Sequence, residues 1–206
     1  MREFLFALTQ FDVMTLLQTG GYIGIATLVF AESGVLIGIF FPGDSLLFAA
    51  GMLSATGFFS FPHLLALVIV AAILGDSVGY WFGAHVGERL YERPDSRFFK
   101  RAYLERTEAF YKKYGTRAVV LARFVPIVRT LAPILAGAGS MSYGIFLRAN
   151  IVGALIWGAG MTSLGYFLGT LIPESEHYIL PISLGIIATS FIPFFIEIFR
   201  EWKKKK

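Results

Sequence analysis

One segment, Arg123 to Met141, constrains the fold most, because it combines charges and prolines with an otherwise apolar sequence. Its two arginines, Arg123 and Arg129, would each cost at least a few kcal/mol in hydrocarbon. Pro126 and Pro133 each remove a helical hydrogen bond and restrict the preceding residue. A continuous lipid-facing helix tolerates this pattern poorly, whereas a re-entrant hairpin lining a wet, protein-walled cavity accepts it. We therefore predict a broken helical hairpin here that presents arginine to an anion.

The composition is that of an integral membrane protein. The chain has 206 residues, of which 56% are hydrophobic and 16% charged, and its mean hydropathy is +0.67. Several apolar runs approach the roughly 20 residues that span a bilayer. The absence of cysteine excludes disulfides and thiolate metal sites, and His63, His85 and His177 occur singly, so we expect no metal and no cofactor. The net charge of +4 gives no reason to propose nucleic acid.

The first half predicts a second hairpin. Val13–Phe41 is 29 residues long with Glu32 as its only charge, which fits a first helix of about 18 residues and then a descending limb. A turn sequence at 41–45, containing Asp44, follows at membrane depth, and Ser45–Phe61 returns as a short apolar limb. His63–Gly87 is then predicted to be a full span. It contains Asp76 and a stripe of glycines suited to close helix packing: Gly75, Gly79, Gly83 and Gly87.

Charge places the remaining segments. Residues 88–117 hold nine Lys or Arg and five Asp or Glu, and five more basic residues lie in the tail after Ile196. The positive-inside rule puts this amphipathic loop and the tail in the cytoplasm. Uncharged runs at 149–172 and 178–196 supply two crossings between them, so the segment 118–141 must be re-entrant for the parity to hold. The same parity in the first half gives a cytoplasmic N-terminus.

An internal repeat supports this topology. Gly79-Tyr80-x-x-Gly83 recurs as Gly165-Tyr166-x-x-Gly169, each near the end of a helix that follows a proline-broken hairpin. The predicted fold is all-α and polytopic, an inverted repeat of two opposed re-entrant hairpins plus about four transmembrane helices. We expect a single membrane domain over 1–206, with these parts: repeat 1 at about 13–87, the cytoplasmic loop at 88–117, repeat 2 at about 118–172, and a C-terminal helix with basic tail at 173–206.

These residues resemble the DedA family of bacterial membrane proteins, also called SNARE-associated or VTT-domain proteins. The motifs that carry the resemblance are Glu32-Ser-Gly34, Phe41-Pro42-Gly43-Asp44-Ser45, Gly75-Asp76-x-x-Gly79-Tyr80-x-x-Gly83 and Arg123-Phe-x-Pro126-x-x-Arg129-Thr130-x-x-Pro133-x-x-Ala136-Gly137. The resemblance implies a multi-pass protein of the bacterial inner membrane that supports envelope homeostasis. Family members carry polyprenyl phosphates such as undecaprenyl phosphate, and eukaryotic relatives scramble phospholipids. The positions matching the family's functional set are Glu32, Asp44, Arg123 and Arg129.

Each charged residue also has a structural interpretation. Arg123 lies early in its segment, so its side chain can snorkel to the interface, while Arg129 should lie deeper. Asp44 follows Pro-Gly and suits a helix N-cap. Glu32 would pair with an arginine of the other hairpin, and Asp76 would bond between helices or act as an accessory proton site.

The predicted function is transport of an anionic lipid phosphate between leaflets. Arg123 and Arg129 would hold the phosphate, because a guanidinium fork matches phosphate oxygens and stays charged. Glu32 and Asp44 would exchange protons during the cycle. A small-anion or ion carrier, or a non-transport assembly protein, stays open, as does a homo-oligomer. We expect no enzyme, since no nucleophile with its base and no metal cluster is evident.

Overall fold

The computed structural model describes residues 13–35, 43–91 and 109–171, and these residues form helices and turns without any strand. The expected loop region 92–108 and the tail 172–206 lie outside the described residues. The helices are α2 (Val13–Gly34), α3 (Gly43–Ala55), α4 (Phe61–Tyr91), α6 (Thr116–Ala122), α7 (Pro126–Ala138), α8 (Tyr143–Ala154), the π-helical turn η2 (Leu155–Ala159) and α9 (Gly160–Leu171). Residues 109–114 are also helical.

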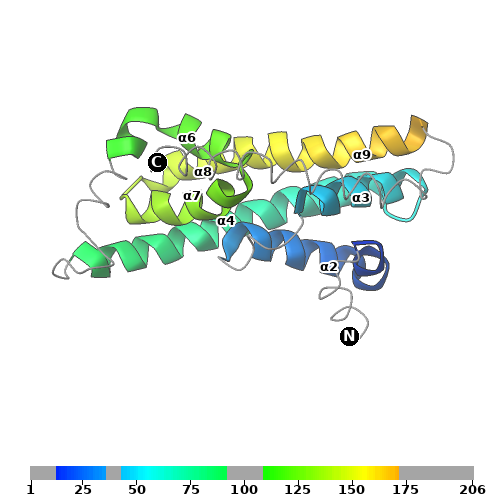
Figure 1. Ribbon diagram of the computed structural model, residues 1–206, viewed down its shortest axis with the longest axis horizontal. Coiled ribbons are helices and arrows are strands. Elements are labelled where there is room, and N and C mark those ends of the chain that lie inside the picture. The colour runs from blue at the N-terminus through cyan, green and yellow to red at the C-terminus, as the bar shows by residue number, and fades with distance from the viewer. Residues whose placement is uncertain (1–12, 36–42, 92–108, 172–206) are drawn as a thin grey trace, which may run out of the picture.

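Two long helices form the frame of the molecule (Figure 1). Within the described residues, Phe61–Val86 and Tyr143–Leu171 are the two helices long and apolar enough to cross a membrane. Pro62 stands in the first turn of α4, where its missing N–H costs nothing, and no proline interrupts α4 after it. α8, η2 and α9 follow one another without a break. The span predicted at His63–Gly87 is therefore confirmed as a helix that extends further at both ends.

Large apolar side chains stand exposed along the outer faces of both long helices. On α4 and α9 they recur at helical spacing, so each helix carries an apolar stripe toward its surroundings. The exposed residues are Val70, Leu74, Val78, Trp81 and Phe82 on α4 and Leu164, Phe167 and Leu171 on α9. Such stripes suit contact with lipid rather than water.

The predicted first helix of about 18 residues is wrong. α2 changes direction at Gly21, whose φ of 53° and ψ of −148° are not helical. Residues other than glycine rarely adopt this backbone conformation, so a glycine is needed at the bend. The part of α2 after the bend, Tyr22–Gly34, leads to the segment before α3 and is too short to cross a membrane by itself.

The hairpin predicted at 118–141 appears as two helices joined by a turn. α6 ends at Ala122, and α7 begins at Pro126 after the turn 123–125. Pro126 occupies the first helical position, which accommodates proline, and α7 continues through Pro133. The break in this segment therefore precedes Pro126 and leaves Pro133 inside a helix. The depth of both hairpins in a membrane stays a prediction.

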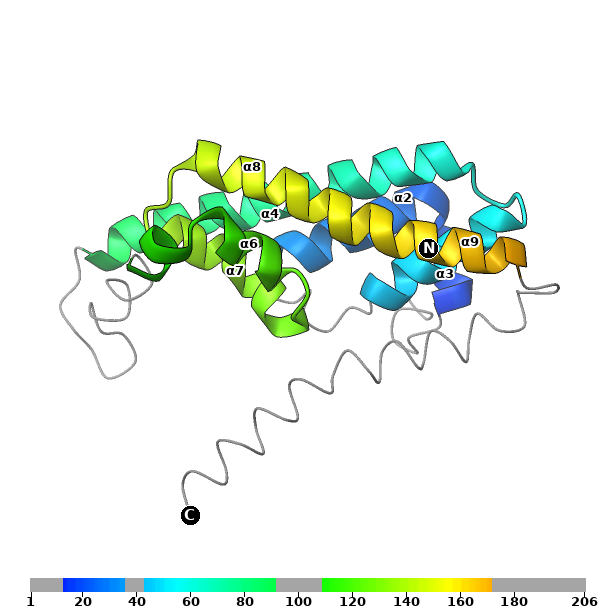
Figure 2. The same cartoon turned by 90° about the horizontal axis from the view of Figure 1, so that it is seen from above.

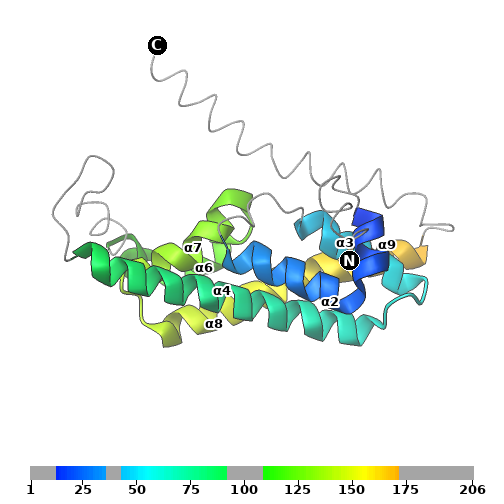
Figure 3. The ribbon, with the colours of Figure 1, turned by 90° about the horizontal axis from the view of Figure 1, so that it is seen from below.

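Each predicted repeat packs one helix against the long helix of the other. α3 packs against α9 and α7 packs against α4, at opposite ends of the long helices (Figures 2 and 3). A Cβ added at Gly51 of α3 would lie 2.1 Å from the Thr162 carbonyl oxygen, and one added at Gly137 of α7 would lie 2.1 Å from the Tyr80 carbonyl oxygen. The sequence offset that relates the two Gly-Tyr-x-x-Gly motifs also relates Gly51 to Gly137. Reciprocal packing of this kind is what two related halves would produce.

The apolar core is divided into two clusters with polar residues between them. On α4 the first cluster ends at Ala72 and the second begins at Tyr80, and Asp76 lies between these positions. On α8 the buried Asn150 lies between Ala149 of the second cluster and Ala154 of the first. The candidate site occupies this polar layer.

Candidate functional site

Arg129 lies between two acids of the first repeat. It stands one turn into α7, and its Nη1 donates to Asp44 Oδ1 at 2.6 Å while its Nη2 pairs with Glu32. The side chains are 11% exposed for Arg129, 20% for Asp44 and 2% for Glu32. Glu32 comes from the end of α2 and Asp44 from the first turn of α3. The end of one helix and the start of the next therefore meet at one guanidinium. Charge-assisted bonds of this kind are the strong ones in proteins.

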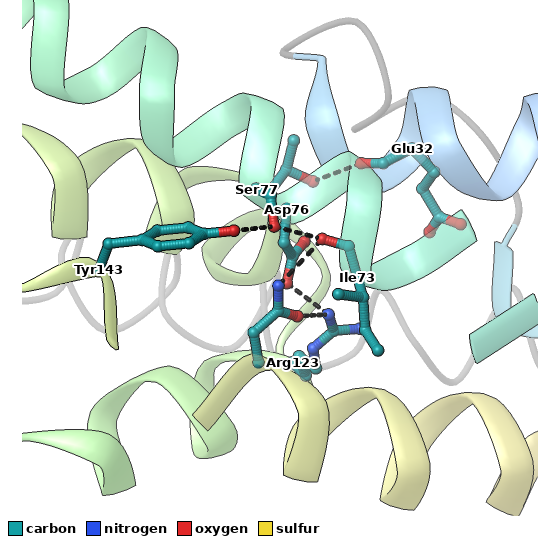
Figure 4. Close-up of polar contacts among 8 residues, drawn as sticks. Glu32, Ile73, Asp76, Ser77, Arg123 and Tyr143 are labelled. Atoms are coloured by element: carbon teal, nitrogen blue, oxygen red, sulfur yellow. Dashed lines mark hydrogen bonds and ion pairs between the residues drawn. The ribbon is translucent and has the colours of Figure 1, made fainter. Parts of the chain in front are cut away.

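Arg123 belongs to a second, more deeply buried group (Figure 4). Its Nη2 pairs with Asp76 and donates to Asn150 Oδ1 at 2.6 Å, and Asn150 Nδ2 donates to the Ile73 carbonyl at 3.1 Å. Arg123 is 4% exposed and Asn150 is fully buried. The interpretation that Arg123 snorkels to the interface is therefore wrong, and its burial exceeds that of Arg129. Gly153 makes room for the arginine stem, since a Cβ there would lie 2.7 Å from Arg123 Cδ.

Trp157 joins the two groups. Its Nε1 donates to Asp44 Oδ1 at 2.7 Å, and its ring centroid lies 5.1 Å from Arg129 Cζ and 5.7 Å from Arg123 Cζ. Cations over an indole face are attracted by the ring quadrupole. Trp157 is buried and lies in η2, and π-helical turns inside longer helices recur at functional sites.

The sequence analysis missed Trp157 and Asn150. A signal for Trp157 existed, because tryptophan in membrane helices is enriched at the interfaces and this one stands in the middle of an uncharged run. Asn150 stands at the start of the same run and gave no comparable signal. Only the tertiary packing shows that both side chains reach the arginines.

The charges are distributed unequally between the repeats. The three carboxylates, Glu32, Asp44 and Asp76, come from the first repeat, and both guanidinium groups come from the second. Every ion pair of this cluster therefore joins one repeat to the other. The cluster holds one more negative than positive group when all are ionised.

Hydrogen-bonding capacity is left over inside the cluster. Among the described residues, Glu32 Oε2, Arg123 Nε and Arg129 Nε are buried without a partner. Such atoms are uncommon in folded proteins and mark places for water or ligand. The Glu32 carboxylate also lies directly against the backbone of Gly43, because a Cβ built on Gly43 would lie 1.5 Å from Glu32 Oε2.

All five ionisable residues singled out from the sequence thus meet in one cluster. Asp44 is bound by Arg129 and Trp157, so helix capping alone does not describe it, and Asp76 is the direct partner of Arg123. The two arginines face one ring but have separate acid partners. In the described part of the chain, no group of three histidines or acids has the arrangement of a metal site.

Comparison with known proteins gives the family. The model of the VTT domain matches residues 41–167. Protein DedA of Escherichia coli K12 is 45% identical over 175 residues, which cover 84% of this chain and 80% of that protein. An uncharacterised membrane protein of Mycobacterium tuberculosis is 40% identical over 185 residues, covering 89% of this chain and 81% of that protein.

A more distant relative is named for its location in the cell. The inner membrane protein YqjA of Escherichia coli K12 is 34% identical over 148 residues, covering 72% of this chain and 67% of that protein. No solved structure matches the chain. The matched family model covers more than half of the sequence, including Asp44, Asp76, both arginines and Trp157. The chain therefore belongs to the VTT-domain (DedA) family of membrane proteins.

Proposed function

We propose that this protein moves an anionic lipid phosphate, of the polyprenyl phosphate class, between membrane leaflets and that a proton accompanies the movement. The observation that carries the proposal is the buried Arg129, held by two acids of the opposite repeat and still carrying an unpartnered Nε. A phosphate can replace a carboxylate at a guanidinium, because both present paired oxygens. Arg129 is thus a cation that a phosphate can take over if an acid releases it.

The charge balance favours a proton-coupled exchange. The cluster already contains three carboxylates and two arginines, so adding a phosphate would increase an excess of negative charge in a buried place. Protonation of Glu32 or Asp44 removes one negative charge and releases Arg129. Binding of a phosphate and uptake of a proton then support each other.

The repeat architecture supports movement across the membrane. Inverted-repeat carriers place their substrate site between repeats near the midplane and rock one repeat against the other. Here every ion pair of the cluster connects the two repeats, so exchanging a pair for a ligand loosens one repeat from the other. The proposed activity is transport without a chemical step, so the protein is not proposed to be an enzyme.

An apolar groove favours a lipid over a small anion. The groove lies between α2 and α4, has a volume of about 800 Å³ and is lined by residues such as Ala26, Phe30, Leu67 and Leu74. Leu74 is two residues from Asp76, so the groove reaches the level of the cluster along α4. A hydrocarbon tail fits such a surface, whereas a small anion would gain nothing from it.

The proposal includes a location in the bacterial inner membrane with both termini in the cytoplasm. The name of the inner membrane protein YqjA supports the location, and the basic loop and tail support a cytoplasmic C-terminus. Its partners are the lipid phosphate and protons.

The test is leaflet exchange in liposomes. Purified protein should increase the exchange of a labelled polyprenyl phosphate, and an imposed pH gradient should change the rate. Arg129→Gln should abolish the increase, whereas Arg148→Gln, at an exposed position outside the cluster, should not. A parallel measurement of inorganic phosphate flux separates the alternatives, because transport of the small anion without lipid exchange would replace the proposal by a small-anion carrier.

A further inference from the structure

Asp44 and Glu32 differ in the hydrogen-bond donors that each would keep if Arg129 turned away. One atom of Asp44, Oδ1, accepts from both Arg129 Nη1 at 2.6 Å and Trp157 Nε1 at 2.7 Å. The Glu32 carboxylate has Arg129 as its partner at Oε1, and its Oε2 has no partner among the described residues. The two acids share an arginine, but only Asp44 has an indole donor besides.

This difference gives the two acids different fates during ligand exchange. When Arg129 binds a phosphate, Asp44 still accepts a hydrogen bond from the indole N–H. Glu32 is left as a buried carboxylate without a donor, and an unpaired buried charge is expensive. The other charged groups around the two acids are Asp76 on α4, Arg123 after α6 and Arg129 on α7. Arg123 stays paired with Asp76 during the exchange.

Resting on the function proposed above, we infer that Trp157 is a positioning residue that divides the work between the two acids. Its N–H holds the Asp44 carboxylate in place when Arg129 turns to the phosphate, and Glu32, which has no such donor, is the acid that takes up the proton. The proton comes from the aqueous phase, forms a bond to the unpartnered Glu32 Oε2, and leaves again when Arg129 returns. The ring of Trp157 also lies against both guanidinium groups, with its centroid 5.7 Å from Arg123 Cζ and 5.1 Å from Arg129 Cζ.

A substitution of Trp157 can separate the contribution of its N–H from that of its ring. Trp157→Phe keeps an aromatic face and removes the donor, so the Asp44 carboxylate would lose the indole hydrogen bond in addition to that of Arg129. A hydrogen bond to a charged group contributes about 1.5–3 kcal/mol, which corresponds to roughly 10- to 150-fold weaker binding of the lipid phosphate. Trp81→Phe is the matched control, because Trp81 is half exposed on α4 and its ring contacts Tyr80, His85 and Tyr143, which lie outside the cluster.

The decisive measurement compares the effect of Trp157→Phe in the natural chain with its effect in variants that lack the Asp44 carboxylate. Binding of a polyprenyl phosphate to protein in nanodiscs should weaken by that factor for Trp157→Phe in the otherwise natural chain, and by less than about twofold when Asp44 is already alanine, because no acceptor remains to be satisfied. If the alanine variant does not fold, Asp44→Asn replaces it. There the loss should be several-fold smaller than in the natural chain, since a neutral amide loses only an ordinary hydrogen bond.

Proton uptake tests the division of roles. In weakly buffered solution with an indicator dye, binding of the lipid should take up protons in Asp44→Asn, and this uptake should be lost in Glu32→Gln. Equal losses for Trp157→Phe in all backgrounds would reduce Trp157 to a packing residue, and uptake that depends on Asp44 instead of Glu32 would overturn the assignment. Normal binding by Trp157→Phe would reject this inference alone, whereas a natural protein that binds no lipid phosphate would reject the proposed function together with it.

Discussion

The two arginines differ in burial and in partners, and this difference decides what each substitution should do. Arg123 is enclosed by Asp76, Asn150 and Gly153, all of which come from the long helices. Arg129 lies between the ends of the first hairpin and is the more exposed of the two. We therefore expect Arg123 to contribute mainly to the stability of the polar layer and Arg129 to be the better placed to meet a ligand.

Arg129→Lys should weaken binding of a lipid phosphate by about 10- to 150-fold while the protein remains folded. Lysine keeps the charge but loses the planar pair of donors, and a charge-assisted bond contributes about 1.5–3 kcal/mol. Headgroup binding at matched expression measures the effect, with Arg148→Lys as the exposed control. Full binding by Arg129→Lys would favour a general electrostatic role for this residue.

Arg123→Met should destabilise the protein by about 3–5 kcal/mol, because it leaves the buried Asp76 carboxylate without its cation. Adding Asp76→Leu should recover most of this loss, since well-packed apolar residues often replace a buried ion pair at little cost. Thermal unfolding in detergent compares the single and double variants. A double variant as unstable as Arg123→Met would show that this pair does more than balance charge.

At the scale of elements, the start of α3 is fitted against the end of α2. Gly43 opens α3, and the Glu32 carboxylate occupies the space that a side chain there would need. The glycine is therefore required for the position of an acid on another helix, and α3 brings Asp44 to Arg129 by the same turn.

Gly43→Ala should displace Glu32 and impair lipid exchange at least as much as Glu32→Gln does. The added Cβ would lie 1.5 Å from Glu32 Oε2, so the acid must move away from Arg129. Overpacking of this kind costs about 1–3 kcal/mol. Gly144→Ala in α8 is the control, because a Cβ there meets nothing within 4 Å. Equal activity of both alanine variants in the liposome assay would contradict this account of the α2–α3 contact.

At the scale of the whole molecule, the acids of one repeat and the arginines of the other hold the two halves together. The apolar outer faces of α4 and α9 and the polar layer between two core clusters fit a protein that surrounds a charged site with lipid-facing helices. The ion cluster does not address the orientation in the membrane, and the basic segments give a prediction for it.

Reporters placed near Pro94 and after Lys206 should both indicate the cytoplasm. Both positions lie outside the described residues, and the expectation rests on the nine basic residues of 88–117 and the five of the tail. A reporter such as alkaline phosphatase fused at each site, paired with one active only in the cytoplasm, measures the side. Opposite locations would mean an odd number of crossings between them and would contradict re-entrance of the segment 118–141.

Local pattern was sufficient for the class of protein and for most helices. Hydropathy and length predicted a membrane protein and the span realised as α4. The packing of α3 against α9 and of α7 against α4 was not predicted. The same pattern failed at Gly21, because a single glycine can bend an apolar run without changing its hydropathy.

By itself, the sequence determined that five ionisable side chains had to be satisfied inside an apolar protein, since charge in hydrocarbon requires a partner. Which partner each would take was decided only by the tertiary structure, because Arg123 meets Asp76 and Arg129 meets Glu32 and Asp44 across large separations in the chain. The burial of Arg123 and the positions of Trp157 and Asn150 also depend on the tertiary structure. Ion pairing and ring contacts depend on distances between helices, and spacing along one helix carries no information about them.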